Sequence, residues 1–190
     1  MPYKQVTNVN IWGFDESVKA SRLPRCAHPD ETSAEVTKKT KALASCPQGS
    51  GHDCFLKGII VQFDLCLPQY MWMQAERYHW FDIVSSQSKD MLVKMDVQAN
   101  CNQWVLPQAI ELVEQLKRVY AVDPTPENWQ LLRSNIPMGF LLTARISTNY
   151  LQLKTIYNQR RRHRLGEWRE FCAWLETLPR FMEWIGGNTQ

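Results

Sequence analysis

Three polar side chains suited to binding a nucleotide follow a short apolar segment in the middle of the chain. Gln74, Arg77 and His79 come after the alternating run Val61 to Leu67 and a proline, Pro68. If a helix continues past Arg77, Gln74 and Arg77 share one face and can present an amide and a guanidinium to one ligand. Arginine binds phosphate in a bidentate manner, and nearby aromatic rings supply stacking surfaces. Those rings belong to Trp72, Tyr78, Trp80 and Phe81. The alternative interpretation is a solvated helix face.

A second group of candidates lies in residues 149–164. Asn149 and Arg160 are 11 positions apart, which is close to three helical turns, so both are expected on one stripe of a helix. An arginine at the end of an apolar stripe either extends to water or enters a pocket. Arg160 also begins the run Arg-Arg-Arg-His-Arg, which ends at Arg164 and can steer an anionic ligand. This run suits a solvated helix end, a nucleotide phosphate site or a nucleic-acid contact, and all three stay open.

The histidine and cysteine pattern gives little support to metal or thiol chemistry. His52 follows a glycine-rich turn, Cys46 to Gly51, and by itself indicates only a loop histidine. The six cysteines contain no C-x-x-C pair, and no zinc-type histidine spacing accompanies them, so we expect no metal site. None has an obvious base beside it, which leaves a cysteine nucleophile unsupported. The cysteines are Cys26, Cys46, Cys54, Cys66, Cys101 and Cys172.

Length and composition indicate one globular domain over residues 1–190. The net charge of +3 is too small to support sequence-independent nucleic-acid binding by itself. No apolar run approaches a membrane span, and residues 1–13 lack the apolar core of a signal peptide. We therefore expect a cytoplasmic protein with reduced thiols and no membrane partner. Eight tryptophans exceed the needs of such a core and indicate stacking surfaces or subunit interfaces.

The apolar periodicity predicts the elements that must position these residues. Strands are expected at 4–12, 59–67 and 140–146. Helices are expected at 33–45, from 68 past 77, from 106 to about 120, at 127–133, from a Ser147-Thr148 cap to 160, and at 168–175. Residues 80–95 show no clear period and are expected to form a loop or a short irregular helix.

Taken together, these spacings resemble the flavin-dependent thymidylate synthase family over most of the chain. In that family Gly-His precedes a strand, proline follows it, and the next helix carries Q-x-x-R. Gly51-His52, Pro68, Gln74 and Arg77 stand at the corresponding spacings. Downstream, Arg133, Pro137, Asn149 and Arg160 look like the family's arginine, proline, asparagine and second arginine, and His163 to Glu167 resembles its His-x-x-x-Glu. The resemblance implies an α/β (α+β) fold whose central, mostly antiparallel sheet is flanked by helices.

The signature loop departs from the family pattern. The second and third residues of an R-H-R triplet are Tyr78 and His79, and the first serine is Asp82. Where the family has N-E-x-S-x-R-Y, residues 84–90 read Val-Ser-Ser-Gln-Ser-Lys-Asp, so Lys89 stands for arginine and Ser88 is displaced by one position. Lysine does not reproduce the bidentate contacts of arginine, which puts substrate identity and catalysis in question.

The resemblance assigns roles to individual residues. Family members are homotetramers that methylate deoxyuridine monophosphate (dUMP) with FAD, NADPH and methylenetetrahydrofolate, in sites formed between subunits. Arg160 would be the catalytic residue, polarising the pyrimidine as charge develops on it. The substrate-binding set would be Gln74, Arg133, Ser88, Lys89 and Arg160. The flavin-binding set would be His52, Arg77, His79 and Asn149.

Three functional hypotheses follow from the sequence. The leading one is a divergent flavin-dependent enzyme that methylates or hydroxymethylates a pyrimidine nucleotide. The alternative is a catalytically inactive protein of the same fold that binds a nucleotide or a partner, of phage or mobile-element origin. The third is a nucleic-acid or protein-partner module that uses Arg160 to Arg164.

Overall fold

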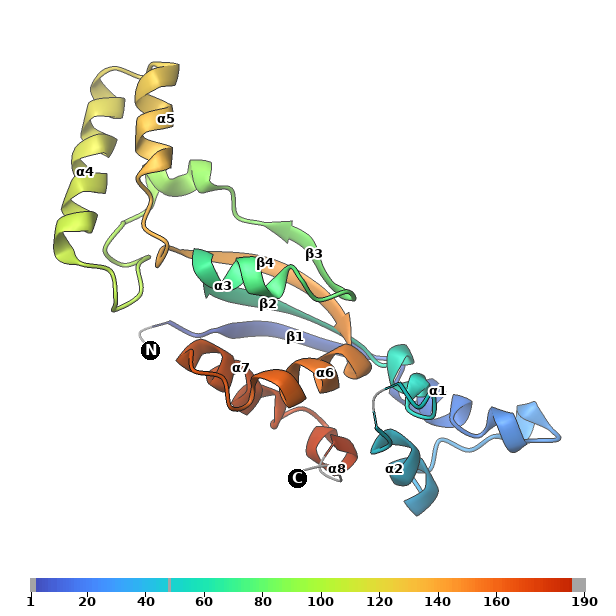
Figure 1. The fold of residues 1–190 in the computed structure, drawn as a ribbon. Coiled ribbons are helices and arrows are strands. Elements are labelled where there is room, and N and C mark those ends of the chain that lie inside the picture. Colours follow the sequence, from blue (N-terminus) through green and yellow to red (C-terminus); the bar gives the residue numbers. More distant parts are fainter. Residues whose placement is uncertain (1–2, 48, 186–190) are drawn as a thin grey trace.

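A computed structural model describes residues 3–47 and 49–185 of the chain (Figure 1). Within these ranges the strands form a four-stranded antiparallel sheet of order β1-β2-β4-β3. The strands are β1 (Val6–Trp12), β2 (Ile60–Pro68), β3 (Phe81–Ser86) and β4 (Leu141–Asn149). The mixed α+β fold with an antiparallel sheet, expected from the resemblance, is confirmed.

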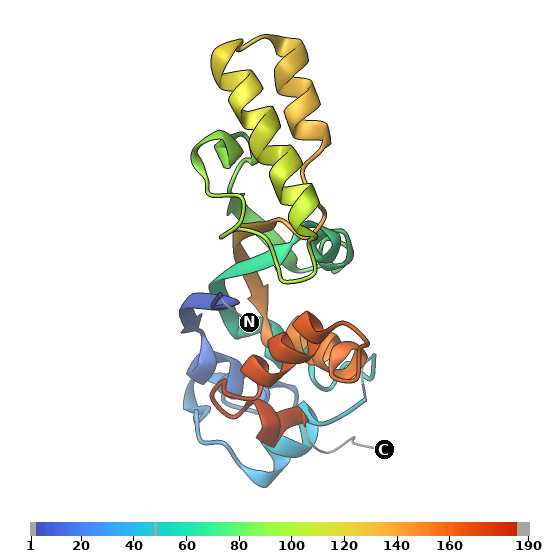
Figure 2. The ribbon, with the colours of Figure 1, turned by 90° about the vertical axis from the view of Figure 1, so that its left-hand side faces the viewer.

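Helices surround this sheet and extend beyond it at both ends. The α-helices are α1 (Phe14–Ala20), α2 (Lys38–Ala44), α3 (Gln69–Ala75), α4 (Pro107–Val122), α5 (Pro126–Ser134), α6 (Tyr150–Arg160), α7 (Gly166–Leu175) and α8 (Phe181–Ile185). Short 3₁₀ helices are η1 (Leu23–Arg25), η2 (Pro29–Glu31), η3 (Cys54–Gly58) and η4 (Lys89–Lys94). The α4–α5 hairpin projects from one end, and α1 and α2 lie at the other (Figure 2).

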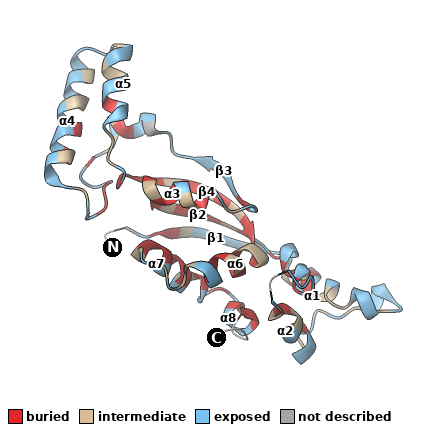
Figure 3. Cartoon of the chain, in the orientation of Figure 1, coloured by how far each residue is buried: buried red, intermediate tan, exposed pale blue. Residues whose placement is uncertain are grey.

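The core lies between one face of the sheet and helices α6 and α7, whose sheet-facing sides are buried (Figure 3). Along β2 the buried side chains of Val61, Phe63 and Leu65 alternate with partly exposed ones, as the sequence predicts. The ring of Phe63 packs against Phe171 and Trp174 of α7, with centroid distances of 5.9 and 4.7 Å. Burial of these aromatic rings fixes α7 against the sheet.

The helix after Pro68 is shorter than the sequence predicts. It ends at Ala75, so the expectation that it continues past Arg77 is wrong. The chain then turns through Trp80, whose φ is +48°, and enters β3. The hydroxyl of Thr148 on β4 donates to the Trp80 carbonyl, 2.5 Å away. Pairing of β3 with β4 therefore ends α3 and directs the chain into the sheet. This is a tertiary effect that local helix propensity does not predict.

Strand β3 falls in residues 80–95, where the sequence predicts only a loop or a short irregular helix. It is an edge strand in which Phe81 alone is buried, so its sequence shows no apolar alternation. The helical part of the expectation is met by η4.

Two helix starts also differ from expectation. α2 begins at Lys38, because Thr37 and Thr40 form a capping box there. The acids Asp30 and Glu31, expected at its front, belong to η2. The cap of α6 is Asn149 rather than Ser147 or Thr148, both of which pair with β2 as part of β4.

Among the remaining helices α4, α5 and α7 are confirmed, whereas α1 and α8 were not expected. No helix within residues 3–47 and 49–185 is long and apolar enough to cross a membrane.

Candidate functional site

Arg160, the last residue of α6, has its guanidinium held in a fixed orientation. Its Nε donates to the Tyr78 hydroxyl at 2.7 Å, and Nη1 donates to Gln74 Oε1 at 3.3 Å. The group also stacks over the Trp168 ring, 4.8 Å from the centroid. No described residue bonds Nη2, so N–H donors remain for a ligand.

Neighbouring side chains hold these partners in turn. Trp168 Nε1 donates to the same Gln74 oxygen at 3.0 Å, and the Tyr78 hydroxyl donates to Gln159 Oε1 at 3.0 Å. The network links α3, the following turn, α6 and α7. Residue types and spacing did not indicate Gln159 or Trp168 as site residues, and they indicated Tyr78 only as a stacking ring and as a departure from the R-H-R triplet. No sequence signal connects them, since Tyr78 and Arg160 are 82 positions apart.

A groove of about 360 Å³ opens beside this network, and we call it the Arg160 groove. It is lined by Gln74, Arg77, Tyr78, His79, Gln152, Thr155, Gln159 and Arg160. Gln74 and Arg77 therefore share a groove, although they do not share a helix face as expected. Arg77 and His79 are exposed, and neither side chain forms a hydrogen bond or ion pair with the described residues. Both are available to a ligand.

A second groove, which we call the Asn149 groove, continues along the same flank of α6. It encloses about 330 Å³ and shares Gln152 and Thr155 with the Arg160 groove. Its lining is Gly49, Gly51, Asp53, Cys54, Lys57, Trp80, Asn149, Leu151, Gln152 and Thr155. Trp80 is 64% exposed and offers its ring to this groove. Gln152 and Thr155 join the two grooves into one polar strip.

Asn149 and Arg160 stand at the two ends of that strip. Asn149 Oδ1 accepts from the Gln152 backbone N–H at 3.0 Å, which caps α6. Leu153 and Ile156, which lie between Asn149 and Arg160 along α6, are buried in the core. Asn149 and Arg160, which the sequence places on one stripe of a helix, therefore line two adjoining grooves.

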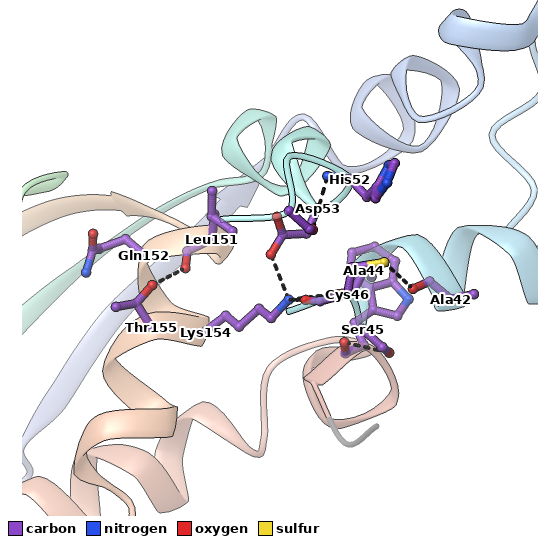
Figure 4. Close-up of polar contacts among 12 residues, drawn as sticks. Ala42, Ala44, Ser45, Cys46, His52, Asp53, Leu151, Gln152, Lys154 and Thr155 are labelled. Atoms are coloured by element: carbon purple, nitrogen blue, oxygen red, sulfur yellow. Dashed lines mark hydrogen bonds and ion pairs between the residues drawn. The ribbon is translucent and has the colours of Figure 1, made fainter. Parts of the chain in front are cut away.

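His52 is placed apart from this strip. It follows Gly51, whose φ of +78° produces the turn that the glycine-rich sequence indicates. Its imidazole is exposed and points away from Lys154 (Figure 4). In this single chain His52 does not line the Asn149 groove, while its neighbour Asp53 does.

Asp53 forms a buried ion pair with Lys154 that no pattern in the sequence indicates (Figure 4). Lys154 on α6 is 4% exposed, and its Nζ lies 2.8 Å from Asp53 Oδ2. The same ammonium donates to the carbonyls of Ala44 and Cys46, each at 2.7 Å. These three contacts tie the end of α2 and the loop beside the Asn149 groove to α6.

The other predicted substrate-binding residues lie in a separate cluster. Arg133 Nη1, at the end of α5, is 3.7 Å from Asp90 Oδ1. Ser88 caps η4 by accepting from the Asp90 backbone N–H at 3.1 Å. Neither residue lines the Arg160 or the Asn149 groove. The side chain of Lys89 lies outside the part of the chain that the structure describes.

His163 follows α6 in an environment that favours the neutral imidazole. Burial lowers the pKa of His163, and the nearby Arg160, Arg164 and Arg169 lower this pKa further. Its Nδ1 accepts from the Leu165 backbone N–H at 3.2 Å, which requires an unprotonated nitrogen. At neutral pH the positive charge of residues 160–164 therefore comes from the four arginines and not from His163.

Acidification should destabilise the fold through His163. Because the pKa is lowered in the folded state, the unfolded chain binds the proton more readily, and stability falls as pH drops through the unfolded value near 6.5. NMR titration of the imidazole should give a midpoint below 6.5, and Arg164→Gln should raise it. A midpoint at or above the ordinary value would contradict this environment.

Two cysteines are poor candidates for nucleophiles. Burial raises the pKa of Cys101 to about 11 and that of Cys172 to about 12, so both thiols are protonated at neutral pH. Among the described residues, no group of three or more His, Cys, Asp or Glu side chains is arranged to hold a metal ion.

Comparison with known proteins identifies the fold. No protein-family model matches the chain, and a search of curated proteins finds no significant match. Among solved structures, flavin-dependent thymidylate synthase ThyX from Helicobacter pylori complexed with FAD and dUMP superposes with a TM-score of 0.75 at 14% identity, covering 97% of this chain and 99% of that one. A second structure of the H. pylori enzyme with FAD and dUMP gives 0.75 at 13% identity, with 98% of each chain covered. The chain thus has, over nearly its whole length, the fold of flavin-dependent thymidylate synthases.

Proposed function

We propose that this protein is a divergent flavin-dependent enzyme that methylates or hydroxymethylates a pyrimidine nucleotide such as dUMP, with FAD and methylenetetrahydrofolate. The orientation of Arg160 carries the proposal. Its guanidinium is held by Gln74, Tyr78 and Trp168 while donors remain free toward a groove. A solvated arginine at a helix end would need none of these contacts, because water would satisfy it.

The polar strip along α6 fits a flavin cofactor. Trp80 offers an exposed ring for stacking, and Gln152 and Thr155 line both grooves. Arg77 and His79 supply unengaged donors for the cofactor's phosphates, which arginine binds well. We assign Arg77, His79 and Asn149 to the flavin, and also His52, although His52 lies apart from the strip in this single chain. When bound, FAD would supply the redox chemistry, with NADPH as the source of reducing equivalents.

Arg160 would bind and polarise the pyrimidine. Its free N–H donors face the groove, and stacking on Trp168 prevents the group from turning away. A donor fixed before the reaction stabilises charge that develops on a carbonyl without reorganising. Gln74 would orient Arg160 and contact the nucleotide, since it also lines the groove.

A complete site on this proposal needs more than one copy of the chain. Ser88 and Arg133 lie outside the Arg160 groove. On this proposal another subunit would bring its own Ser88, Lys89 and Arg133 to the nucleotide phosphate. The edge strand β3 exposes Ile83, which lines an apolar groove of about 340 Å³ with the exposed Met73 and Met138. Exposed apolar surface beside an unpaired strand edge favours self-association, consistent with a homotetramer.

Absorption spectra of the purified protein provide the test. FAD added to the full chain should give a flavin spectrum that shifts again when dUMP is added. Arg77→Gln should weaken FAD binding, whereas Arg118→Gln on exposed α4 carries the same charge change and should not. A protein that leaves the FAD spectrum unaltered would overturn the flavin assignment.

The alternative is a catalytically inactive protein that keeps the fold and binds a nucleotide or a partner. Its motivation is the signature loop, where Asp90 forms an ion pair with Arg133, the arginine assigned to the nucleotide phosphate. Binding of FAD and dUMP without formation of a methylated product would favour this alternative. Product formed from dUMP in the presence of methylenetetrahydrofolate would exclude it.

A further inference from the structure

A pocket at the opposite end of the molecule from the α4–α5 hairpin gathers positive charge. It encloses about 270 Å³ between the segment after α1 and the start of α2, and we call it the Arg22 pocket. Arg22, Arg25 and Lys39 line it, and Glu31 is the acid among its lining residues. None of its lining residues belongs to the Arg160 or the Asn149 groove.

The cations of the Arg22 pocket form no ion pair with the described residues. Arg22 Nη2 donates to the Glu35 carbonyl, but its Nε is buried and bonds none of the described residues. A buried donor without an acceptor is costly, so a turn of the guanidinium toward an anion in the pocket would be favoured. Arg25 and Lys39 form no ion pair with any described residue.

Most hydroxyl groups in the pocket wall already bond to other described residues. Thr37 and Thr40 bond each other in the capping box of α2. The hydroxyls of Ser21 and Thr32 donate to the carbonyls of Val18 and Pro29. Ser33 Oγ accepts from the Glu35 backbone N–H. The charged donors left for a ligand are the guanidinium and ammonium groups, which select for negative charge.

We propose that the Arg22 pocket binds the phosphate end of a small phosphate ester, at a site separate from the grooves along α6. Guanidinium groups match phosphate oxygens in geometry and charge. The cavity is slightly smaller than the roughly 300–1,000 Å³ typical of small-molecule sites, so it holds a phosphoryl or diphosphoryl group while the rest of the ligand extends outward. The site does not depend on the proposed flavin chemistry.

Calorimetric titration of the full chain with pyrophosphate at constant ionic strength tests this site. Arg25→Gln/Lys39→Gln should weaken binding by about tenfold or more, because it removes charge-assisted hydrogen bonds. Lys38→Gln/Arg118→Gln is a matched control, since both residues are exposed, lie outside the pocket and carry the same charge. The control should bind pyrophosphate like the unaltered protein.

Two further titrations test whether the Arg22 pocket is separate from the flavin site and which kind of phosphate ligand it binds. Protein saturated with FAD should bind pyrophosphate with unchanged affinity, and a lost affinity would mean that the pocket belongs to the flavin site. If both double variants lost pyrophosphate affinity equally, the binding would reflect only the overall positive charge of the protein. That result would overturn the proposal. The proposal would also be overturned if the protein bound a single-stranded oligonucleotide tightly but did not bind pyrophosphate. The surface would then be a nucleic-acid contact and not a site for a small phosphate ester.

Discussion

Replacing Arg160 with glutamine should lower the rate of pyrimidine methylation by about 10²–10³-fold, the usual effect of removing one prearranged donor from developing charge. The physical reason is that glutamine lacks both the charge and the planar fork that Tyr78 and Gln74 hold in place. The measurement is the rate of formation of thymidine monophosphate from dUMP, with FAD and the folate supplied.

Two further variants separate catalysis from stability and from charge. Arg160→Lys keeps the charge but loses the fork, so it should recover little activity. Arg162→Gln removes an exposed positive charge two positions away and should leave the rate within a few-fold of the unaltered protein. FAD binding that persists in Arg160→Gln would show that the scaffold is intact. Activity retained by that variant would remove Arg160 from the reaction.

Replacing Lys154 with methionine should destabilise the protein by about 3–5 kcal/mol, as breaking one partner of a buried ion pair generally does. The change leaves the Asp53 carboxylate buried without its counter-charge and removes the donor for the carbonyls of Ala44 and Cys46. Urea unfolding followed by circular dichroism measures this effect. Protein concentration must be held constant, because association adds to apparent stability.

The matched control is Lys38→Met, in which an exposed lysine on α2 is lost at a cost within about 0.5 kcal/mol. Lys154→Met/Asp53→Leu should be more stable than Lys154→Met alone, since no unpaired charge stays buried. The two carbonyls remain without their donor, so recovery should be partial. A Lys154→Met variant as stable as the control would contradict the role assigned to the pair.

Sequence periodicity predicted the elements whose one face is buried. The alternation in β2 and the apolar spacing of α4 and α7 are repeated enough to specify strand and helix. It failed at β3, which buries only Phe81, and at the end of α3, where sheet pairing rather than local propensity turns the chain. An element with one buried face leaves a periodic apolar pattern in the sequence. An exposed edge strand, or a turn set by tertiary contacts, leaves no such pattern.

The candidate site divides in the same way. Residue types and spacing by themselves selected Gln74, Arg77 and Arg160, and the structure places all three in one groove. Only the tertiary structure decided that Tyr78 and Trp168 fix the Arg160 guanidinium, and that Ser88 and Arg133 lie apart from it. It also decided the Lys154–Asp53 pair, whose partners are 101 positions apart. Side chains brought together by packing of separate elements have no fixed spacing, so the sequence names the chemical groups while the fold decides which of them meet.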